Sequence, residues 1–261
     1  MSQFLSLKNI EKSIPISKDE DKILLKKINF EVQKNEIVAI VGNKGCGKTT
    51  LLNIISGLER QSKGQVILNG RIVDGAGQDR AMVLKHHSFL PWLSSYENIE
   101  MVLHKVMPEL EPEELQERIA YFISMGELDE VQYLLPRKLD EEMRHRLGIV
   151  QALAISPDIV LLDQPFSSLN TLTRHKMQAY LLEVKEKTKS TVMLITDDVD
   201  EAVYLSDRII MMSAISNHSI EEILEVKVPH PRERVALQSN PIYMSCREKI
   251  FRFLYESQET I

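Results

Sequence analysis

The sequence predicts an α/β protein with a mainly parallel β-sheet covered by helices on both faces. Short apolar runs that suit buried strands recur along the chain, and most are separated by segments of helical period. This alternation is the pattern of βαβ units in a parallel sheet. The chain has 261 residues and is 43% hydrophobic, so it can bury one large core with an inserted or appended subdomain.

The expected strands are apolar runs that either alternate with polar residues or are continuous. They are residues 23–32, 36–41, 65–70, 81–84, 158–162, 191–196 and 208–212. Between about residues 97 and 156 such runs stop, and the sequence has helical period, with Pro112 suited to a first helical turn. We therefore expect a helical subdomain inserted into the sheet.

The last part of the chain is more irregular. Residues 228–235, "VPHPRERV", are expected to be extended because of their prolines. Residues 243–258 predict an amphipathic helix with Ile250, Phe253 and Leu254 on one side.

Charge and cysteine content exclude several classes of protein. The net charge is −6 with acids and bases mixed, so the chain lacks the basic tract that binds nucleic acid. Cys46 and Cys246 have no second metal ligand at a suitable spacing, which favours a reduced, cytosolic compartment. The first residues do not resemble a secretion signal, and no apolar run reaches the roughly 20 residues that span a bilayer. Any membrane role is expected to be peripheral.

A phosphate-binding loop follows the second expected strand. The motif is Gly42-x4-Gly47-Lys48-Thr49, between a strand and a helix. Its backbone N–H groups can wrap phosphates, Lys48 can neutralise them and the Thr49 hydroxyl can ligate Mg²⁺. An ordinary glycine-rich turn is the alternative, but motif and flanks agree on a nucleotide site. The expected nucleotide-binding residues of the loop are Gly42, Asn43, Lys44, Gly45, Cys46, Gly47, Lys48, Thr49 and Thr50.

A second part of such a site is an acid at the end of a buried strand. The run "DIVLLD" ends in Asp163, which is expected to hold Mg²⁺ together with Thr49. On its own this Asp would more often cap the end of a strand, and the phosphate loop is what favours the metal.

With these motifs placed, the chain resembles the ATP-binding subunits of ABC transporters, especially those of nitrate, bicarbonate and alkanesulfonate importers. The resemblance lies in "VGNKGCGKTTLLNIISGLERQSKGQVILNG", "HHSFLPWLSSYENI", "PDIVLLDQPFSSLNTLTR", "DDVDEAVYLSDRIIMM" and "ILEVKVPHPRERV". It implies a P-loop NTPase fold, with a RecA-like core, an antiparallel β-subdomain and an inserted helical subdomain. It also implies that two such domains sandwich two ATP molecules between the loop of one and the signature segment of the other.

That resemblance implies a subdomain division of a single nucleotide-binding domain. Residues 1–96 and 157–225 would form the RecA-like and β core, 97–156 the helical subdomain and 226–261 a C-terminal extension.

The chain departs from the family at positions that serve hydrolysis. Where relatives have the glutamate that polarises the attacking water, this sequence has Gln164, whose amide cannot accept a proton at neutral pH. The switch histidine falls on Asp197, and like charges about 4 Å apart repel by about 4 kcal/mol at surface-like screening. The glutamine that joins Mg²⁺ to the membrane partner falls on Lys85, which has no acceptor atom.

The signature segment also differs from that of relatives, which have Ser and two Gly there. Three carboxylates in this segment would repel a partner's γ-phosphate. The corresponding residues are Leu139, Asp140, Glu141, Glu142 and Met143. The adenine-stacking aromatic falls on Ile14, which leaves apolar contact without stacking, and the Asp after the dimer-contacting loop falls on Asn170.

Each substitution has an ordinary explanation by itself. Acids at a helix start are favoured by the helix dipole, and Gln164 alone is the change one would introduce deliberately to keep ATP intact. Five changes with one shared job indicate that the fold is kept and the hydrolytic apparatus is not.

The first hypothesis is a degenerate ATP-binding subunit of a small-anion importer. It would bind ATP or ADP with Mg²⁺ at the cytoplasmic face of the inner membrane, and pair with an active ATPase in a heterodimer more readily than with itself. A permease subunit would dock on an apolar anchor made by Phe89, Leu90, Trp92 and Tyr96, unless these pack against the chain's own helices. The alternatives are a non-catalytic regulatory module that docks on a transporter, and an active ABC ATPase.

Overall fold

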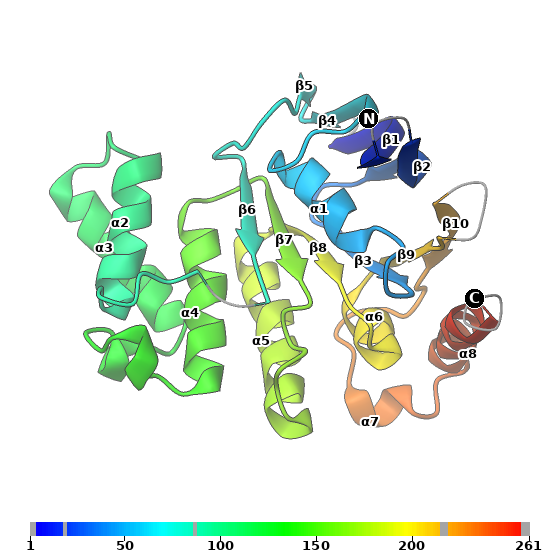
Figure 1. Cartoon of the computed structure of the whole chain (residues 1–261). Coiled ribbons are helices and arrows are strands. Elements are labelled where there is room, and N and C mark those ends of the chain that lie inside the picture. The colour runs from blue at the N-terminus through cyan, green and yellow to red at the C-terminus, as the bar shows by residue number, and fades with distance from the viewer. Residues whose placement is uncertain (1–3, 18–19, 86–87, 215–218, 257–261) are drawn as a thin grey trace. The chain divides into compact units, whose positions relative to one another are not determined.

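The computed structural model describes residues 4–17, 20–85, 88–214 and 219–256. The chain forms two compact units, residues 1–77 with 191–261, and residues 78–190. Each unit has its own strands and helices (Figure 1).

The first unit contains an antiparallel sheet in the order β2-β1-β4-β5. Its strands are β1 (Leu5–Ser17), β2 (Glu20–Val32), β4 (Lys63–Leu68) and β5 (Arg71–Ile72). Leu5, Leu7 and Ile10 of β1 are at most 2% exposed, so this strand turns its apolar side chains into the core. The register of β1 against β2 shifts after Leu7, where Asn9 has a left-handed backbone.

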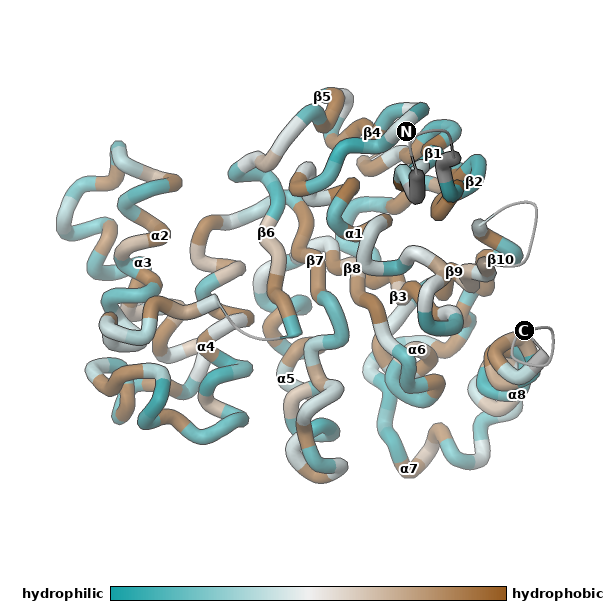
Figure 2. The backbone as a smooth tube through the Cα atoms, in the orientation of Figure 1, coloured by the Kyte–Doolittle hydropathy of each residue, from teal (hydrophilic) through white to brown (hydrophobic). Residues whose placement is uncertain are grey.

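The same unit contains the parallel strands that carry the phosphate loop. β3 (Ile37–Gly42) pairs in parallel with β8 (Thr191–Ile195) on one side and with β9 (Arg208–Met212) on the other. β10 (Ile220–Glu225) adds an antiparallel edge to β9. β3 and β8 are buried along their whole length and are mostly hydrophobic (Figure 2), as expected of central parallel strands.

The described residues of this unit form four helices. They are α1 (Lys48–Ser56), α6 (Val199–Leu205), α7 (Arg234–Leu237) and α8 (Pro241–Glu256). α1 and α6 both contact β3, and α8 packs on α6 (Figure 1). Since the parallel strands end at one edge, the segments that follow β3 and β8 leave the sheet side by side.

The second unit has a parallel strand pair and a group of helices. β6 (Arg80–Val83) pairs with β7 (Ile159–Asp163). The helices are α2 (Ser95–Val106), α3 (Pro112–Met125), α4 (Glu141–Ala154) and α5 (Thr171–Thr188), with 3₁₀ turns at Asp129–Val131 and Pro136–Lys138. α4 contacts β6 and each of the other three helices.

The structure confirms the predicted α/β class with a mixed, mostly parallel set of strands and a separate antiparallel sheet. All seven expected strands are present, and Pro112 is the first residue of α3. The sequence prediction missed β1, β5 and β10. The extended segment expected at 228–235 was wrong at its end, because α7 begins at Arg234. Among the described residues, no helix is both long and apolar enough to cross a membrane.

Candidate functional site

The loop between β3 and α1 has a backbone that only glycine permits at two positions. A Cβ on Gly42 would lie 2.2 Å from the Met212 carbonyl oxygen. Gly47 has φ +94°, and a Cβ there would lie 2.5 Å from the Leu25 side chain. A turn with the Cys46 N–H donating to the Asn43 carbonyl closes the loop. The glycines therefore fix the tight wrap that brings backbone N–H groups to the start of α1.

Lys48, the first residue of α1, folds back over this loop. Its side chain is 8% exposed. Its ammonium group donates to the Gly42 carbonyl at 2.5 Å and to the Asn43 carbonyl at 3.3 Å. The third neighbour is the Asp197 carboxylate, 3.2 Å from Nζ. Because an ammonium group has three donors, these three acceptors satisfy it.

Asp197 is therefore a partner of the loop lysine. It follows β8, and its side chain is 63% exposed. The sequence predicted repulsion between this acid and a triphosphate. It did not predict that the same carboxylate neutralises the lysine that would receive the phosphates. That contact could not be inferred from spacing, since Lys48 follows β3 and Asp197 follows β8, far apart in the sequence.

The rest of the loop divides into buried and exposed side chains. Cys46 is 1% exposed, and burial raises the pKa of its thiol. Lys44, Gly45 and Thr49 are exposed, while Thr50 is half-buried. Ile14 lies on β1 opposite Lys22 and is 42% exposed, so it offers an apolar surface.

The loop fits a nucleotide's phosphates in the way its motif predicts. The residue before α1 is Gly47, which offers no side chain to cap the helix, and the N-terminus of a helix attracts anions. A Cβ on Gly45 would meet nothing within 4 Å, so the outer side of the loop is open. Thr49 supplies an exposed hydroxyl. Among the described residues no cluster of three His, Cys, Asp or Glu could hold a metal ion.

The C-terminal helix contacts this loop, which the sequence did not predict. The Asn43 amide donates to the Leu254 carbonyl of α8 at 3.2 Å. Asp200, in the first turn of α6, accepts from the Tyr243 hydroxyl and from the Arg247 guanidinium, both at 3.0 Å. α8 thereby touches both the loop and the helix that follows Asp197.

Arg232 ties the other end of α6 to the C-terminal segment. It is 5% exposed, and its Nη1 donates to the carbonyls of Val203, Tyr204 and Ser206 at 2.8 to 3.0 Å. Burial lowers the pKa of the guanidinium, whose N–H groups donate to backbone carbonyl oxygens. The arginine satisfies carbonyls that the end of a helix leaves unpaired.

In the second unit, Asp163 ends β7 and Gln164 begins a tight turn. Both side chains are half-buried. Gln164 has a left-handed backbone with φ +48°, and its carbonyl accepts from the Ser167 N–H and hydroxyl. The turn fixes the backbone of Gln164, from which its side chain extends. The roles of both residues in the chemistry remain sequence predictions.

The acidic signature segment forms the start of α4. Asp140 is the N-cap residue, and its carboxylate accepts from the Met143 N–H at 2.7 Å. Glu142 pairs with Arg146 at 3.1 Å, and the Glu141 carbonyl contacts Nδ1 of His145 at 2.8 Å. Leu139 is 3% exposed and anchors the turn. A carboxylate of the chain itself thus occupies the N-terminus of this helix.

Asn170 has a similar capping role. Its side chain accepts from the Thr173 N–H at 3.1 Å at the start of α5. Asn and Asp cap helices about equally well, so an Asn at this position suits the start of α5.

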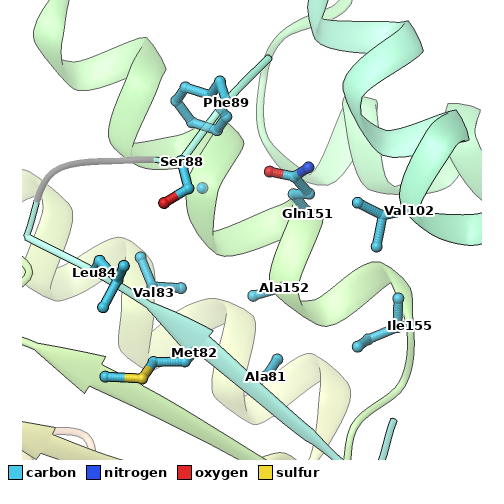
Figure 3. Close-up of a pocket in the computed structure, with 11 residues that line it drawn as sticks. Ala81, Met82, Val83, Leu84, Ser88, Phe89, Val102, Gln151, Ala152 and Ile155 are labelled. Atoms are coloured by element: carbon cyan, nitrogen blue, oxygen red, sulfur yellow. The ribbon is translucent and has the colours of Figure 1, made fainter. Parts of the chain in front are cut away.

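An apolar hollow of about 250 Å³ lies between β6, α2 and α4 (Figure 3). Gln151 and Val102 lie on one side of it, and Met82 and Leu84 on the other. Phe89, one of the predicted anchor residues, lines this hollow. Lys85 is exposed beside it in the chain, directly after Leu84.

The other three anchor residues lie outside the hollow's lining. Trp92 is 69% exposed, Leu90 is half-buried, and Tyr96 stands 5.9 Å from the Tyr133 ring. The four predicted anchor residues therefore differ in their surroundings. Tyr96 packs within its own unit, whereas Trp92 is exposed and available for a contact outside it.

A strand, a glycine loop and a helix that carries a buried lysine define a phosphate-binding domain of the P-loop NTPase class. The family model described as "ABC transporter" matches residues 25–167, and the chain belongs to that family. The dimeric structure of a post-hydrolysis state of the ATP-binding cassette MJ0796, bound to ADP and Pi, has a TM-score of 0.72 and 26% identity. The match covers 86% of this chain and 100% of that one.

Two curated relatives are transport proteins of Synechococcus elongatus. The nitrate import ATP-binding protein NrtD is 36% identical over 89% of this chain and 85% of its own length. The bicarbonate transport ATP-binding protein CmpC is 39% identical over 99% of this chain. The chain spans 39% of the length of CmpC.

Proposed function

We propose that this chain is a nucleotide-binding subunit of an importer for a small anion, such as nitrate, nitrite, bicarbonate or a sulfonate. It would act at the cytoplasmic face of the inner membrane as a hydrolysis-poor partner of an active ATPase. The names of NrtD and CmpC support the solute class. The observation that carries the hydrolysis-poor role is the ion pair between Lys48 and Asp197 at 3.2 Å.

The phosphate loop is the part of the chain that would hold ATP or ADP. Its N–H groups and Lys48 would bind the phosphates, and the Thr49 hydroxyl would ligate Mg²⁺. Mg²⁺ supplies neutralisation of the phosphate charge. Ile14 would give apolar contact to the base. The assignment of Asp163 to the same metal stays a prediction from the sequence.

Hydrolysis needs a group that takes a proton from water, and Gln164 lacks it. An amide oxygen can accept a hydrogen bond from water but does not become protonated near neutral pH. The left-handed turn at Gln164 holds this amide on a defined backbone. Binding without turnover is therefore the expected behaviour of the isolated chain.

A heterodimer suits the chain better than a homodimer. In a homodimer both sites would combine Gln164, Asp197 and the acidic start of α4. With an intact relative, one site would keep that partner's own catalytic residues and borrow only Asp140, Glu141 and Glu142 from this chain. Weak turnover at that second site is compatible with the proposal.

The permease is proposed to dock at the hollow lined by Phe89, with Trp92 as an outer contact. The hollow is mainly apolar, and Leu84 at its rim is 40% exposed. An aromatic residue in an apolar recess is a frequent anchor of interfaces. Phe89→Ala is expected to reduce co-purification with the membrane subunits more than Tyr96→Ala, because Tyr96 already packs on Tyr133.

A regulatory module that docks on a transporter without driving it is the second candidate. The hydrogen bond between Asn43 and α8 favours this regulatory role. A nucleotide bound at the loop would change the surroundings of Asn43 and so act on the C-terminal helix. Transport lost in a Lys48→Ala variant supports the subunit role. Transport that continues, or rises, when the chain is deleted supports the regulatory role.

The proposal predicts that purified chain binds nucleotide but releases no phosphate above a Lys48→Ala control. Phosphate release is measured with Mg-ATP at saturating concentration, and binding by calorimetry in the same buffer. Adding an intact ATPase subunit together with the permease is expected to give turnover that depends on the added subunit. Release from the isolated chain well above the control would instead identify an ordinary active ATPase.

A further inference from the structure

We propose that Asp197 makes the phosphate loop selective for a nucleoside diphosphate over the corresponding triphosphate. This inference rests on the proposed function, since it requires that the loop binds a nucleotide. It names which nucleotide the loop prefers and the residue that sets the preference.

The three acceptors around Lys48 differ in where they come from. Two are the carbonyls of Gly42 and Asn43, which belong to the loop that Lys48 itself closes. The third is the Asp197 carboxylate, which comes from the segment after β8. Two acceptors of the ammonium group therefore belong to the loop, and the third, the Asp197 carboxylate, lies outside it.

A diphosphate and a triphosphate make different demands on this arrangement. Backbone N–H groups of such a loop hold the inner phosphates, while the lysine reaches the β- and γ-phosphates. A diphosphate keeps most of its contacts because they come from the backbone. The γ-phosphate must share Lys48 with the Asp197 carboxylate.

The charge balance also favours the diphosphate. With Asp197 beside it, the Lys48 charge is already offset, and a γ-phosphate would bring further negative charge close to a carboxylate. Like charges repel more strongly where they are partly shielded from water. Lys48 is 8% exposed and Asp197 is 63% exposed, so the carboxylate lies beside a buried cation and partly outside bulk water.

Asp197 is not free to swing far from the loop. The preceding Thr196 is 3% exposed, and its N–H donates to the Ile40 carbonyl of β3 at 3.2 Å. The following Asp198 caps α6 through the Glu201 N–H at 3.0 Å. Because both neighbours are fixed, only the side-chain torsions of Asp197 can relieve the repulsion.

The strength of the Lys48–Asp197 pair does not decide the selectivity. An ion pair with one exposed partner contributes little to stability. The selectivity comes from the extra negative charge of the triphosphate, which meets the carboxylate only when nucleotide binds.

Calorimetric titrations of the full chain with ADP and with ATP, both with saturating Mg²⁺, test this proposal. We expect the Kd for ATP to exceed that for ADP by about tenfold or more, which equals about 1.4 kcal/mol. Asp197→Asn should lower this ratio by about tenfold, and Asp197→His should lower it further by replacing the acid with a donor. Asp74→Asn removes one exposed carboxylate from the same unit and should leave the ratio unchanged.

The outcomes separate the two proposals. The selectivity is overturned if the wild-type chain binds ATP as tightly as ADP or more tightly. It is also overturned if the ratio of the Kd for ATP to the Kd for ADP is the same in both Asp197 variants as in the wild type. In either case nucleotide binding itself stands. If neither nucleotide binds to chain that is folded by circular dichroism, nucleotide binding and selectivity both fail. Two variants of an exposed residue guard against loss of folding in one of them.

Discussion

Two carboxylates of this chain lie at positions where the resemblance to ABC transporters leads us to expect a phosphate. Asp197 contacts Lys48, and Asp140 caps the start of α4. In each case a side chain satisfies groups that would otherwise attract an anion. Each carboxylate therefore has a stabilising partner in the fold, and each is expected to weaken the binding of a phosphate.

Substitutions at Asp140 can distinguish the effect of its helix-capping hydrogen bond from the effect of its negative charge. Asp140→Ala should lower the free energy of unfolding by about 1 kcal/mol, because the Met143 N–H loses its acceptor. Asp140→Ser should keep most of the stability, since a serine hydroxyl also caps. Urea unfolding measures both variants.

Asp129→Ala is the matched control for Asp140→Ala. It removes the same charge from an exposed residue that caps no helix by its side chain. Its unfolding midpoint should stay close to that of the wild type. If Asp140→Ser destabilises as much as Asp140→Ala, the hydroxyl is not replacing the cap and this account of the α4 start is wrong.

At the scale of elements, the C-terminal segment fixes the helix that follows Asp197. Arg232 holds the end of α6 through its carbonyls, while Tyr243 and Arg247 hold its start at Asp200. The position of Asp197 thus depends on residues far along the chain. The sequence marked 243–258 as an amphipathic helix, and the buried Ile250 shows which side faces inward.

Arg232→Met should destabilise the chain by about 3 kcal/mol, because several buried carbonyls lose their donor and methionine offers none. Thermal and urea unfolding measure the loss. Arg252→Met, which removes an exposed pair with Glu248, should change stability by less than about 0.5 kcal/mol. Similar losses in the two variants would show that Arg232 is not the anchor of α6.

How far the elements could be predicted depended on the regularity of each pattern. The continuous apolar runs of β3, β7 and β8 were found because both faces of these strands are covered. β1 was missed because its register shifts near Asn9, which interrupts the alternation of period two. β10, "IEEILE", was missed because an edge strand exposes polar side chains.

The site was predictable where its residues are contiguous. The residues from Gly42 to Thr49 form a local motif with a known backbone geometry, so the strand, the loop and the helix could all be predicted from the sequence. The contact between Asn43 and Leu254 joins residues 211 positions apart and leaves no local pattern. The pairing of Lys48 with Asp197 has the same origin, since it depends on β3 and β8 being neighbours.

For the whole molecule, the acidic start of α4 bears on self-association. Relatives are expected to dimerise by placing this segment on a partner's bound ATP. Here Asp140, Glu141 and Glu142 would oppose the γ-phosphate, so binding energy that holds such a dimer together is lost. The chain should depend on another subunit to complete the sandwich.

The isolated chain is therefore predicted to remain monomeric with Mg-ATP. Sedimentation velocity or light scattering after gel filtration measures its mass, with Lys48→Ala as a control that should give the same result. An Asp140→Ser, Glu141→Gln, Glu142→Gln variant should associate more readily. A wild-type dimer that forms only with ATP would refute the expected repulsion.

The hydrogen bond between Asn43 and α8 also allows changes at the loop to be followed by fluorescence. Tyr255, one residue beyond Leu254, is 56% exposed, and both native thiols are buried with a raised pKa. A thiol-reactive dye would therefore label a Tyr255→Cys variant at that single position in preference to Cys46 or Cys246. Because Leu254 is hydrogen-bonded to the loop, the dye's emission would follow events at the loop in real time, without altering a loop residue.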